Sequence, residues 1–96
     1  MVLHTLNASP SSAAFEDCLR LIASGDSLLL LGDAVYGAIT GTTARQALDN
    51  SGAALFVLLD DATVAGVAKR LDGVTLVDMT GFVELTEQCP RQLAWY

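Results

Sequence analysis

Cys18 is the residue of this chain best suited to chemistry, and two interpretations of it compete. Phe15, Leu19 and Ile22 recur with it at helical spacing, which predicts one apolar stripe of an amphipathic helix. A thiol on such a stripe behaves as a small buried hydrophobe, whereas a reactive thiol needs an electropositive or partly exposed setting. Arg20 stands two residues further on. The spacing favours a core thiol, and a reactive Cys18 stays open.

The other candidate side chains carry weaker signals. Cys89 precedes Pro90, so we expect it to be the more exposed thiol, but an isolated loop cysteine indicates no particular reaction. His4 falls inside the first predicted strand, where we expect a core or interface imidazole with both nitrogens hydrogen-bonded and not a triad base. One histidine and two cysteines without paired spacing cannot build a metal site. The sequence therefore predicts no metal and no firm catalytic residue.

Aspartates follow three of the predicted strands. They are Asp33, the pair Asp60-Asp61, and Asp78. In a first interpretation these side chains cap the helices that follow, because aspartate is a favoured N-cap. In a second, they line a cleft at the carboxyl ends of the strands, where open α/β sheets bind ligands. Such an acidic rim would suit a cationic ligand.

Two nucleotide-binding motifs are missing. Gly37 and Gly41 are spaced one residue too closely for a phosphate-binding Walker loop, and threonines 42 and 43 stand where that loop requires lysine. The first predicted strand is followed by Asn-Ala-Ser-Pro at 7–10 and not by a GxGxxG turn. No cofactor is expected.

Short apolar blocks alternate with segments of helical period. The blocks lie at 2–6, 28–31, 54–59 and 74–77, and helices are expected after Ser12, at 34–48 with an interruption near Gly41, at 62–71 and at 81–88. Strands that are apolar on both faces are typical of a parallel sheet covered by helices. The alternation therefore predicts an α/β fold with a four- or five-stranded, mainly parallel sheet and helices on both faces. The expected core is Leu3, Leu29, Leu30, Val57, Leu58 and Leu76.

Length and composition limit the remaining classes of fold and function. Ninety-six residues fit one domain, 1–96. The 52% hydrophobic content argues against disorder and indicates subunit contacts in so small a chain. Eleven acidic and five basic residues give a net charge of −6, which disfavours direct binding to nucleic acid or to an anionic membrane. No apolar run approaches the ~20 residues of a membrane helix and no signal peptide is visible, so a cytoplasmic location is expected.

Several short motifs, taken in order, resemble the TusB/DsrH family of small sulfur-relay subunits. The resemblance covers essentially the whole chain, and no single motif is diagnostic alone. The motifs are Leu3-His4-Thr5-Leu6-Asn7 with Ser9-Pro10, Cys18-Leu19-Arg20-Leu21 with Gly25-Asp26, the block 28–31 with Asp33 and Val35-Tyr36, Val77-Asp78, Gly81-Phe82-Val83, and Trp95 after Pro90.

The resemblance implies a DsrE-like three-layer α/β fold. It also implies a heterohexamer with two copies each of three related subunits of the B, C and D types. In the family, this complex passes persulfide sulfur from a carrier protein towards the 2-thio group of the tRNA wobble uridine. In sulfur-oxidising bacteria the related complex serves dissimilatory sulfur metabolism. The principal sulfur-accepting cysteine belongs to the D-type subunit, so a B-type chain is expected to be mainly structural and non-catalytic.

Three functions therefore stay open. The favoured one is a structural subunit of a TusBCD-like sulfurtransferase complex, since an acidic chain suits protein carriers and an apolar excess suits an obligate interface. In the second, Cys18 is itself a persulfide carrier, because it matches a cysteine of the DsrH branch that many TusB chains lack. The third is a small α/β module that binds a ligand at its strand ends.

Overall fold

The computed structural model describes residues 1–95. Within them the chain alternates strands and helices as predicted. The elements are, in order, β1 (Val2–Leu6), α1 (Ala13–Leu21), β2 (Ser27–Leu30), the 3-10 helix η1 (Gly32–Ala38), α2 (Thr43–Asn50), β3 (Ala54–Leu58), α3 (Leu59–Val64), the 3-10 helix η2 (Ala68–Arg70), β4 (Thr75–Val77), α4 (Met79–Gln88) and β5 (Arg91–Trp95).

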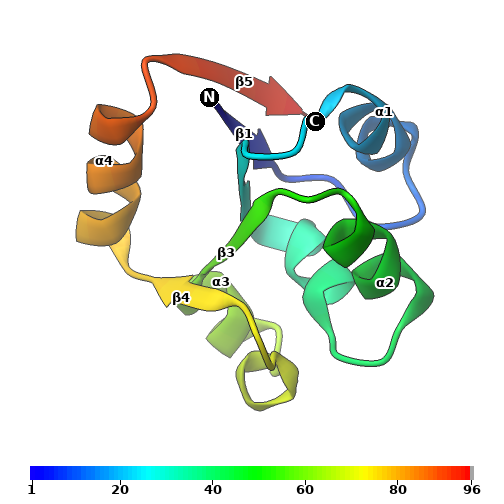
Figure 1. Ribbon diagram of the computed structural model, residues 1–96. Helices are drawn as coiled ribbons and strands as arrows, with labels where there is room; N and C mark the ends of the chain where they lie inside the picture. The colour runs from blue at the N-terminus through cyan, green and yellow to red at the C-terminus, as the bar shows by residue number, and fades with distance from the viewer. Residues whose placement is uncertain (96) are drawn as a thin grey trace.

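The five strands form one sheet in the order β4-β3-β2-β1-β5, and every neighbouring pair is parallel. From β1 to β4 each strand is added on the same side of the previous one, and β5 then returns to the free side of β1. Because crossovers between parallel strands are right-handed, the first three connections cover one face and α4 covers the other. Figure 1 shows α4 on one side of the sheet and α1 and α2 on the other. The predicted three-layer α/β fold is confirmed.

The two faces of the sheet carry two separate cores. Along β2, Leu28 and Leu30 point into the larger core beneath α1, η1, α2 and α3, whereas Leu29 points into the smaller core beneath α4. This alternation is the period-2 geometry of a strand. Five of the predicted core residues are buried: Leu3, Leu29, Leu30, Val57 and Leu58.

The prediction of a buried Leu76 is wrong. Its side chain is 39% exposed, although it pairs in register with the buried Val57 of β3. The reason is its place at the edge of the sheet, since β4 has a neighbouring strand on one side only. A continuous apolar block therefore did not distinguish an edge strand from a central one.

The helices differ from the predicted ranges, and the tail forms an additional strand. The segment expected at 34–48 consists of η1 and α2, with Gly41 at φ +88° in the interruption. The segment expected at 62–71 begins earlier and ends at Val64, because Gly66 takes a left-handed φ of +76° that breaks the helix. The residues after Pro90 form β5, which pairs with β1 from Val2 to Leu6.

Candidate functional site

Cys18 lies in the middle of α1 and is completely buried. Ser12 begins this helix, because its hydroxyl accepts a hydrogen bond from the Phe15 N–H at 3.2 Å. The thiol joins the larger core together with Phe15 and Leu6. Burial raises the pKa of Cys18 to about 11, since a low-dielectric setting disfavours the thiolate. The core placement predicted from helical spacing is confirmed.

Cys89 is also buried, so its expected greater exposure is wrong. Its side chain is 1% exposed and lies in the smaller core beside Leu3, Leu29 and Leu85. Its backbone N–H donates to the Leu85 carbonyl at 3.1 Å and closes the last turn of α4. The proximity of Pro90 indicated a loop, but the i, i+4 spacing from Leu85 keeps the thiol against the sheet. The two cysteines therefore lie under opposite faces of the sheet.

His4 is a core imidazole with both nitrogens hydrogen-bonded, as predicted. The side chain is 1% exposed; Nε2 lies 3.0 Å from Asp26 Oδ2, and Nδ1 lies 3.1 Å from Trp95 Nε1. The indole N–H can only donate, so Nδ1 is the acceptor and Nε2 carries the proton. This cluster links β1, the start of β2 and the end of β5. It joins the first and last strands of the sheet through side chains as well as backbone.

Asp26 is the anionic centre of that cluster. Its carboxylate accepts hydrogen bonds from the backbone of Ala23 at 3.0 Å and of Val2 at 3.1 Å, in addition to that from His4. The Ala23 N–H and then the His4 imidazole lower the pKa of Asp26 to about 2, because these donors favour the charged form. The carboxylate and imidazole are both buried and hydrogen-bonded within the chain, so we interpret this cluster as structural.

The aspartates after the strands divide between the two interpretations. Asp78 caps α4, because its Oδ1 accepts from the Gly81 N–H at 2.8 Å. Asp61 instead bonds to another segment. Its Oδ2 accepts a hydrogen bond from the Gly32 N–H at 2.7 Å, which joins the segments that follow β2 and β3. A shallow pocket of about 180 Å³ lies there. Its lining residues are Gly32, Asp33, Tyr36, Asp61, Val64 and Ala65.

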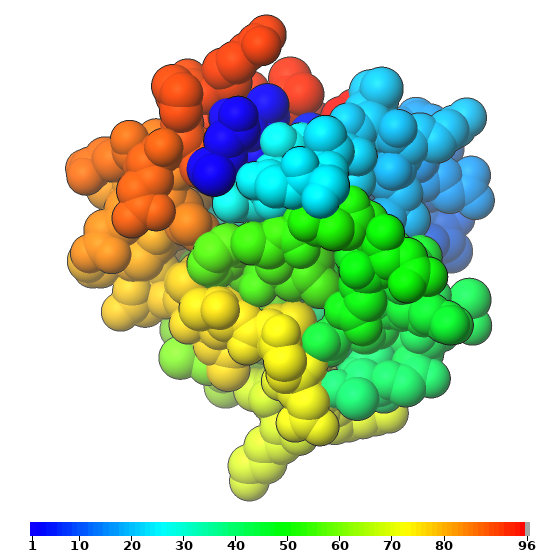
Figure 2. Space-filling view, viewed as in Figure 1, coloured from blue at the N-terminus to red at the C-terminus, as the bar shows by residue number. Residues whose placement is uncertain are grey.

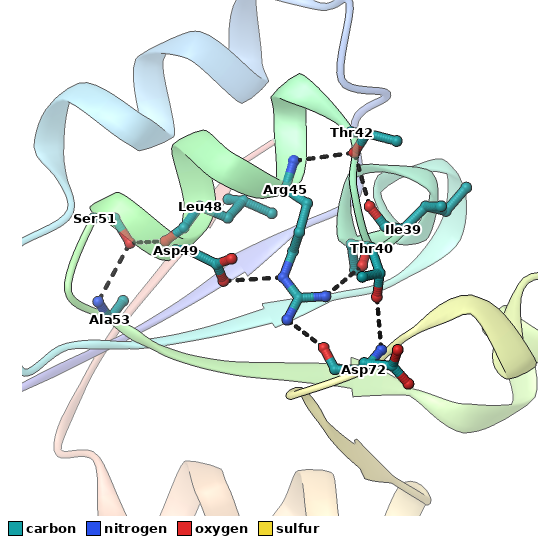
Figure 3. Close-up of polar contacts among 10 residues, drawn as sticks. Ile39, Thr40, Thr42, Arg45, Leu48, Asp49, Ser51, Ala53 and Asp72 are labelled. Atoms are coloured by element: carbon teal, nitrogen blue, oxygen red, sulfur yellow. Dashed lines mark hydrogen bonds and ion pairs between the residues drawn. The ribbon is translucent and has the colours of Figure 1, made fainter.

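Arg45 is a buried anchor that joins three segments (Figure 3). Its Nε donates to Asp49 at 2.9 Å, its Nη1 donates to the Ala38 carbonyl at 2.7 Å, and its Nη2 donates to the Asp72 carbonyl. The side chain is 6% exposed. Each guanidinium nitrogen already donates within the chain, so Arg45 fixes α2 to the end of η1 and to the loop before β4.

Residues 1–95 contain neither a metal-ligand cluster nor a helix fit to span a membrane. No three His, Cys, Asp or Glu side chains in that range gather closely enough to hold a metal ion. No helix of the described residues has the length and apolarity needed to cross a bilayer.

The parallel strand order β4-β3-β2-β1-β5, with helices on both faces, places the chain among small three-layer α/β proteins. Two solved structures share this fold. YchN from Escherichia coli superposes with a TM-score of 0.74 at 15% identity, covering 97% of each chain. Tm0979 from Thermotoga maritima superposes with a TM-score of 0.68 at 18% identity, covering 92% of this chain and 93% of that one. At these identities the likeness shows the fold alone.

Sequence comparison identifies the family. A family model described as DsrH like protein matches residues 8–92. Protein TusB of Escherichia coli K12 is 38% identical over 95 residues, which cover 98% of this chain and 100% of that protein. Protein TusB of Klebsiella pneumoniae strain 342 is 42% identical over the same coverage. The chain belongs to the DsrH-like family, as its motifs predicted.

Sequence reasoning missed two residues that matter for the structure. Asp26 had appeared only as part of a family motif, and its contact with His4 spans 22 positions of sequence. The only local sign was its place directly before a strand. Arg45 and Asp49 have the i, i+4 spacing of an ordinary exposed helical pair. Nothing in that spacing indicates that residues 38 and 72 enclose the guanidinium.

Proposed function

We propose that this chain is the B-type subunit of a TusBCD-like heterohexameric sulfurtransferase complex that relays persulfide sulfur for 2-thiolation of the tRNA wobble uridine. The observation that carries the proposal is the match to TusB proteins over 98% of the chain. In this proposal residues 1–96 act as one domain in the cytoplasm. The partners are C-type and D-type subunits, and sulfur-carrier proteins meet the chain through the complex. The chain itself contacts neither tRNA nor a membrane.

The role proposed for this chain is mainly structural. Sulfur relay requires a thiolate that attacks a sulfane sulfur, so an acceptor must be accessible and deprotonated. Cys18 and Cys89 are both at most 1% exposed, and burial raises the pKa of Cys18 to about 11. These properties support a sulfur acceptor on another subunit, which the family resemblance assigns to the D type. The net charge of −6 supports contact with proteins and not with RNA.

Co-purification and tRNA analysis test the proposal together. The chain is co-expressed with C-type and D-type subunits from the same genome, and native mass spectrometry should give two copies of each. Deleting the chain's gene should abolish the 2-thio group on the wobble uridine, measured by mass spectrometry of digested tRNA. The catalytically null allele of the D-type cysteine is the matched control. Normal thiolation in the deletion strain would contradict the tRNA assignment, and a chain that elutes alone would contradict the complex.

A further inference from the structure

The smaller core leaves an apolar surface uncovered next to α4. In the helix, Phe82, Leu85 and Cys89 face the sheet at i, i+3 and i+7. Met79 and Val83 lie one step around the helix and are 54% and 52% exposed. The apolar arc of α4 is therefore wider than the part that the sheet covers. In the space-filling view α4 forms an outer wall of the molecule, orange in Figure 2.

The position of this arc follows from the contacts on the other side of α4. A groove of about 180 Å³ there is lined by Gly81, Glu84, Leu85 and Gln88 of the helix and by Phe56 and Val77 of the sheet, so that side of α4 faces β3 and β4. Met79 and Val83 consequently lie on the side of β1 and β5. The hydrogen bond from Gln92 of β5 to the Thr86 carbonyl, at 3.2 Å, agrees with this orientation.

The neighbouring sheet surface is also only partly covered. Thr5 and Leu31 are half-buried and Ala94 is exposed, and register places Thr5 beside Ala94. We call Met79, Val83, Thr5, Leu31 and Ala94 the α4 flank. The fold explains why it is open, since one ten-residue helix crosses a five-stranded sheet diagonally, from the end of β4 to the start of β5.

The charged side chains of α4 and its ends are all acidic. Residues 77–90 contain Asp78, Glu84 and Glu87 and no Lys, Arg or His. Among residues 1–95 the ion pairs join Arg20 to Asp17 and Arg45 to Asp49, and His4 forms a hydrogen bond with Asp26. None of these pairs includes an acid of α4. The next cation, Arg91, lies on the opposite face of the sheet, because its neighbour Gln92 points to α4.

We propose that the α4 flank binds a non-identical subunit that presents an apolar ridge bordered by Lys or Arg. The inference deepens the proposed function, on which it rests, by naming the face through which the chain enters its complex. A second copy of this chain does not fit, since a two-fold contact would set the acids of α4 against one another. A basic border would instead meet Glu87, one helical turn after Val83, and the apolar ridge would cover Met79 and Val83.

The first test is methionine footprinting of the unmodified complex with C-type and D-type subunits. The chain contains two methionines, Met1 at 73% exposed and Met79 at 54%. Peroxide oxidises exposed methionine to the sulfoxide, which mass spectrometry counts. In the isolated chain both should be oxidised at similar rates. In the complex we expect Met79 to be protected at least ~10-fold, as for a desolvated interface position, while Met1 remains the internal control.

The second test places a charge in the surface. Val83→Glu should weaken binding of the partner subunits at least ~30-fold, because it buries an unpaired carboxylate at an acidic contact. Val64→Glu is the matched control, since Val64 is 89% exposed on α3, away from the α4 flank. Circular dichroism checks that both variants fold. Glu87→Lys should weaken binding less and should remove part of its salt dependence.

The outcomes separate the two proposals. If the wild-type chain forms no complex with these subunits, the proposed function fails and this inference fails with it. If the complex forms, Met79 stays oxidisable and Val83→Glu assembles like the wild type, the inference alone is overturned. Protection of Met79 together with loss of assembly in Val83→Glu, but not in Val64→Glu, supports it.

Discussion

The two faces of the sheet differ in how completely they are covered. On one face, α1, η1, α2 and α3 enclose a core that includes Leu28, Leu30 and Val57, all completely buried. On the other face α4 alone encloses Leu3 and Leu29 and leaves half-buried apolar groups around it. The difference originates in the strand order, because only the last crossover runs back along the sheet. The larger core is thus closed by several helices, whereas the smaller core leaves apolar side chains partly exposed.

The largest expected loss of stability comes from two substitutions in β2, one in each core. Leu30→Ala should lower the free energy of unfolding by about 4 kcal/mol, because the four helical segments over the larger core cannot collapse into the cavity. Leu29→Ala should cost about 3 kcal/mol, since one helix can move inward more easily. Both residues are completely buried and adjacent in β2, so the pair is matched. Urea unfolding followed by circular dichroism measures the difference.

Equal losses of unfolding free energy in the two variants would contradict the proposed difference between the two faces of the sheet. They would mean that α4 covers its face as rigidly as the other helices cover theirs. A change in the slope of the denaturation curve would instead report a change in the surface exposed on unfolding. In that case the two free energies could not be compared, and Leu→Val at the same position would replace the alanine variant.

A smaller loss of stability is expected from a substitution in the cluster of His4, Asp26 and Trp95 that joins β1 to β5. The folded pKa of Asp26, about 2, lies below the value of ~3.9 for an unfolded aspartate. A lowered folded pKa stabilises the protein above the unfolded value, so this contribution is complete above about pH 4 and is lost as the pH falls towards 2. Asp26→Asn should remove about 2 kcal/mol at neutral pH and should flatten this acid dependence.

The control for Asp26 is an exposed acid. Asp17 pairs with Arg20 at the surface of α1, and surface pairs contribute ~0–1 kcal/mol. Asp17→Asn should therefore leave the acid unfolding profile nearly unchanged. If the stability of Asp26→Asn depended on pH as the wild type does between pH 4 and 2, the acid sensitivity would have to come from other carboxylates.

The general fold could be predicted because it depends on local patterns. Apolar blocks separated by helical periods identified β1 to β4, and alternation implied parallel pairing. The strand β5 lacked such a block, since Arg91 and Gln92 begin it and four of its five residues are exposed. Its pairing with β1 joins positions about 90 residues apart. The exposure of Leu76 likewise depends on strand order, which no local pattern contains.

The site residues show the same division between local and long-range information. Helical spacing was enough to predict that Cys18 is buried, and its place in a strand was enough to predict that His4 is buried. The end of the helix at Gln88 was predicted correctly, but the burial of Cys89, the next residue, depends on how α4 packs against the sheet. The partners of Arg45 and His4 come from segments distant in sequence. Hydrogen bonds of that kind follow only from the assembled topology.

The smallest expected effect on stability concerns the two thiols, one beneath each face. Cys18→Ala should cost on the order of 1 kcal/mol, the loss of one small buried group, and Cys89→Ala is its counterpart beneath α4. In the folded chain neither thiol should react with an aromatic disulfide reagent. Cys89 should become reactive first in rising urea, because α4 is the only helix over it and it lies near the end of the described chain.

Cys18→Ala should also leave sulfur relay largely intact. The reason is that a protonated thiol inside the larger core offers no thiolate to a persulfide donor. The measurement loads the assembled complex from a persulfidated carrier protein and maps the modified thiols by mass spectrometry, with Cys89→Ala as the matched control. Persulfide on Cys18, together with loss of relay in Cys18→Ala complexes that still assemble, would contradict this expectation. It would make the chain a sulfur carrier and would require α1 to open the larger core during transfer.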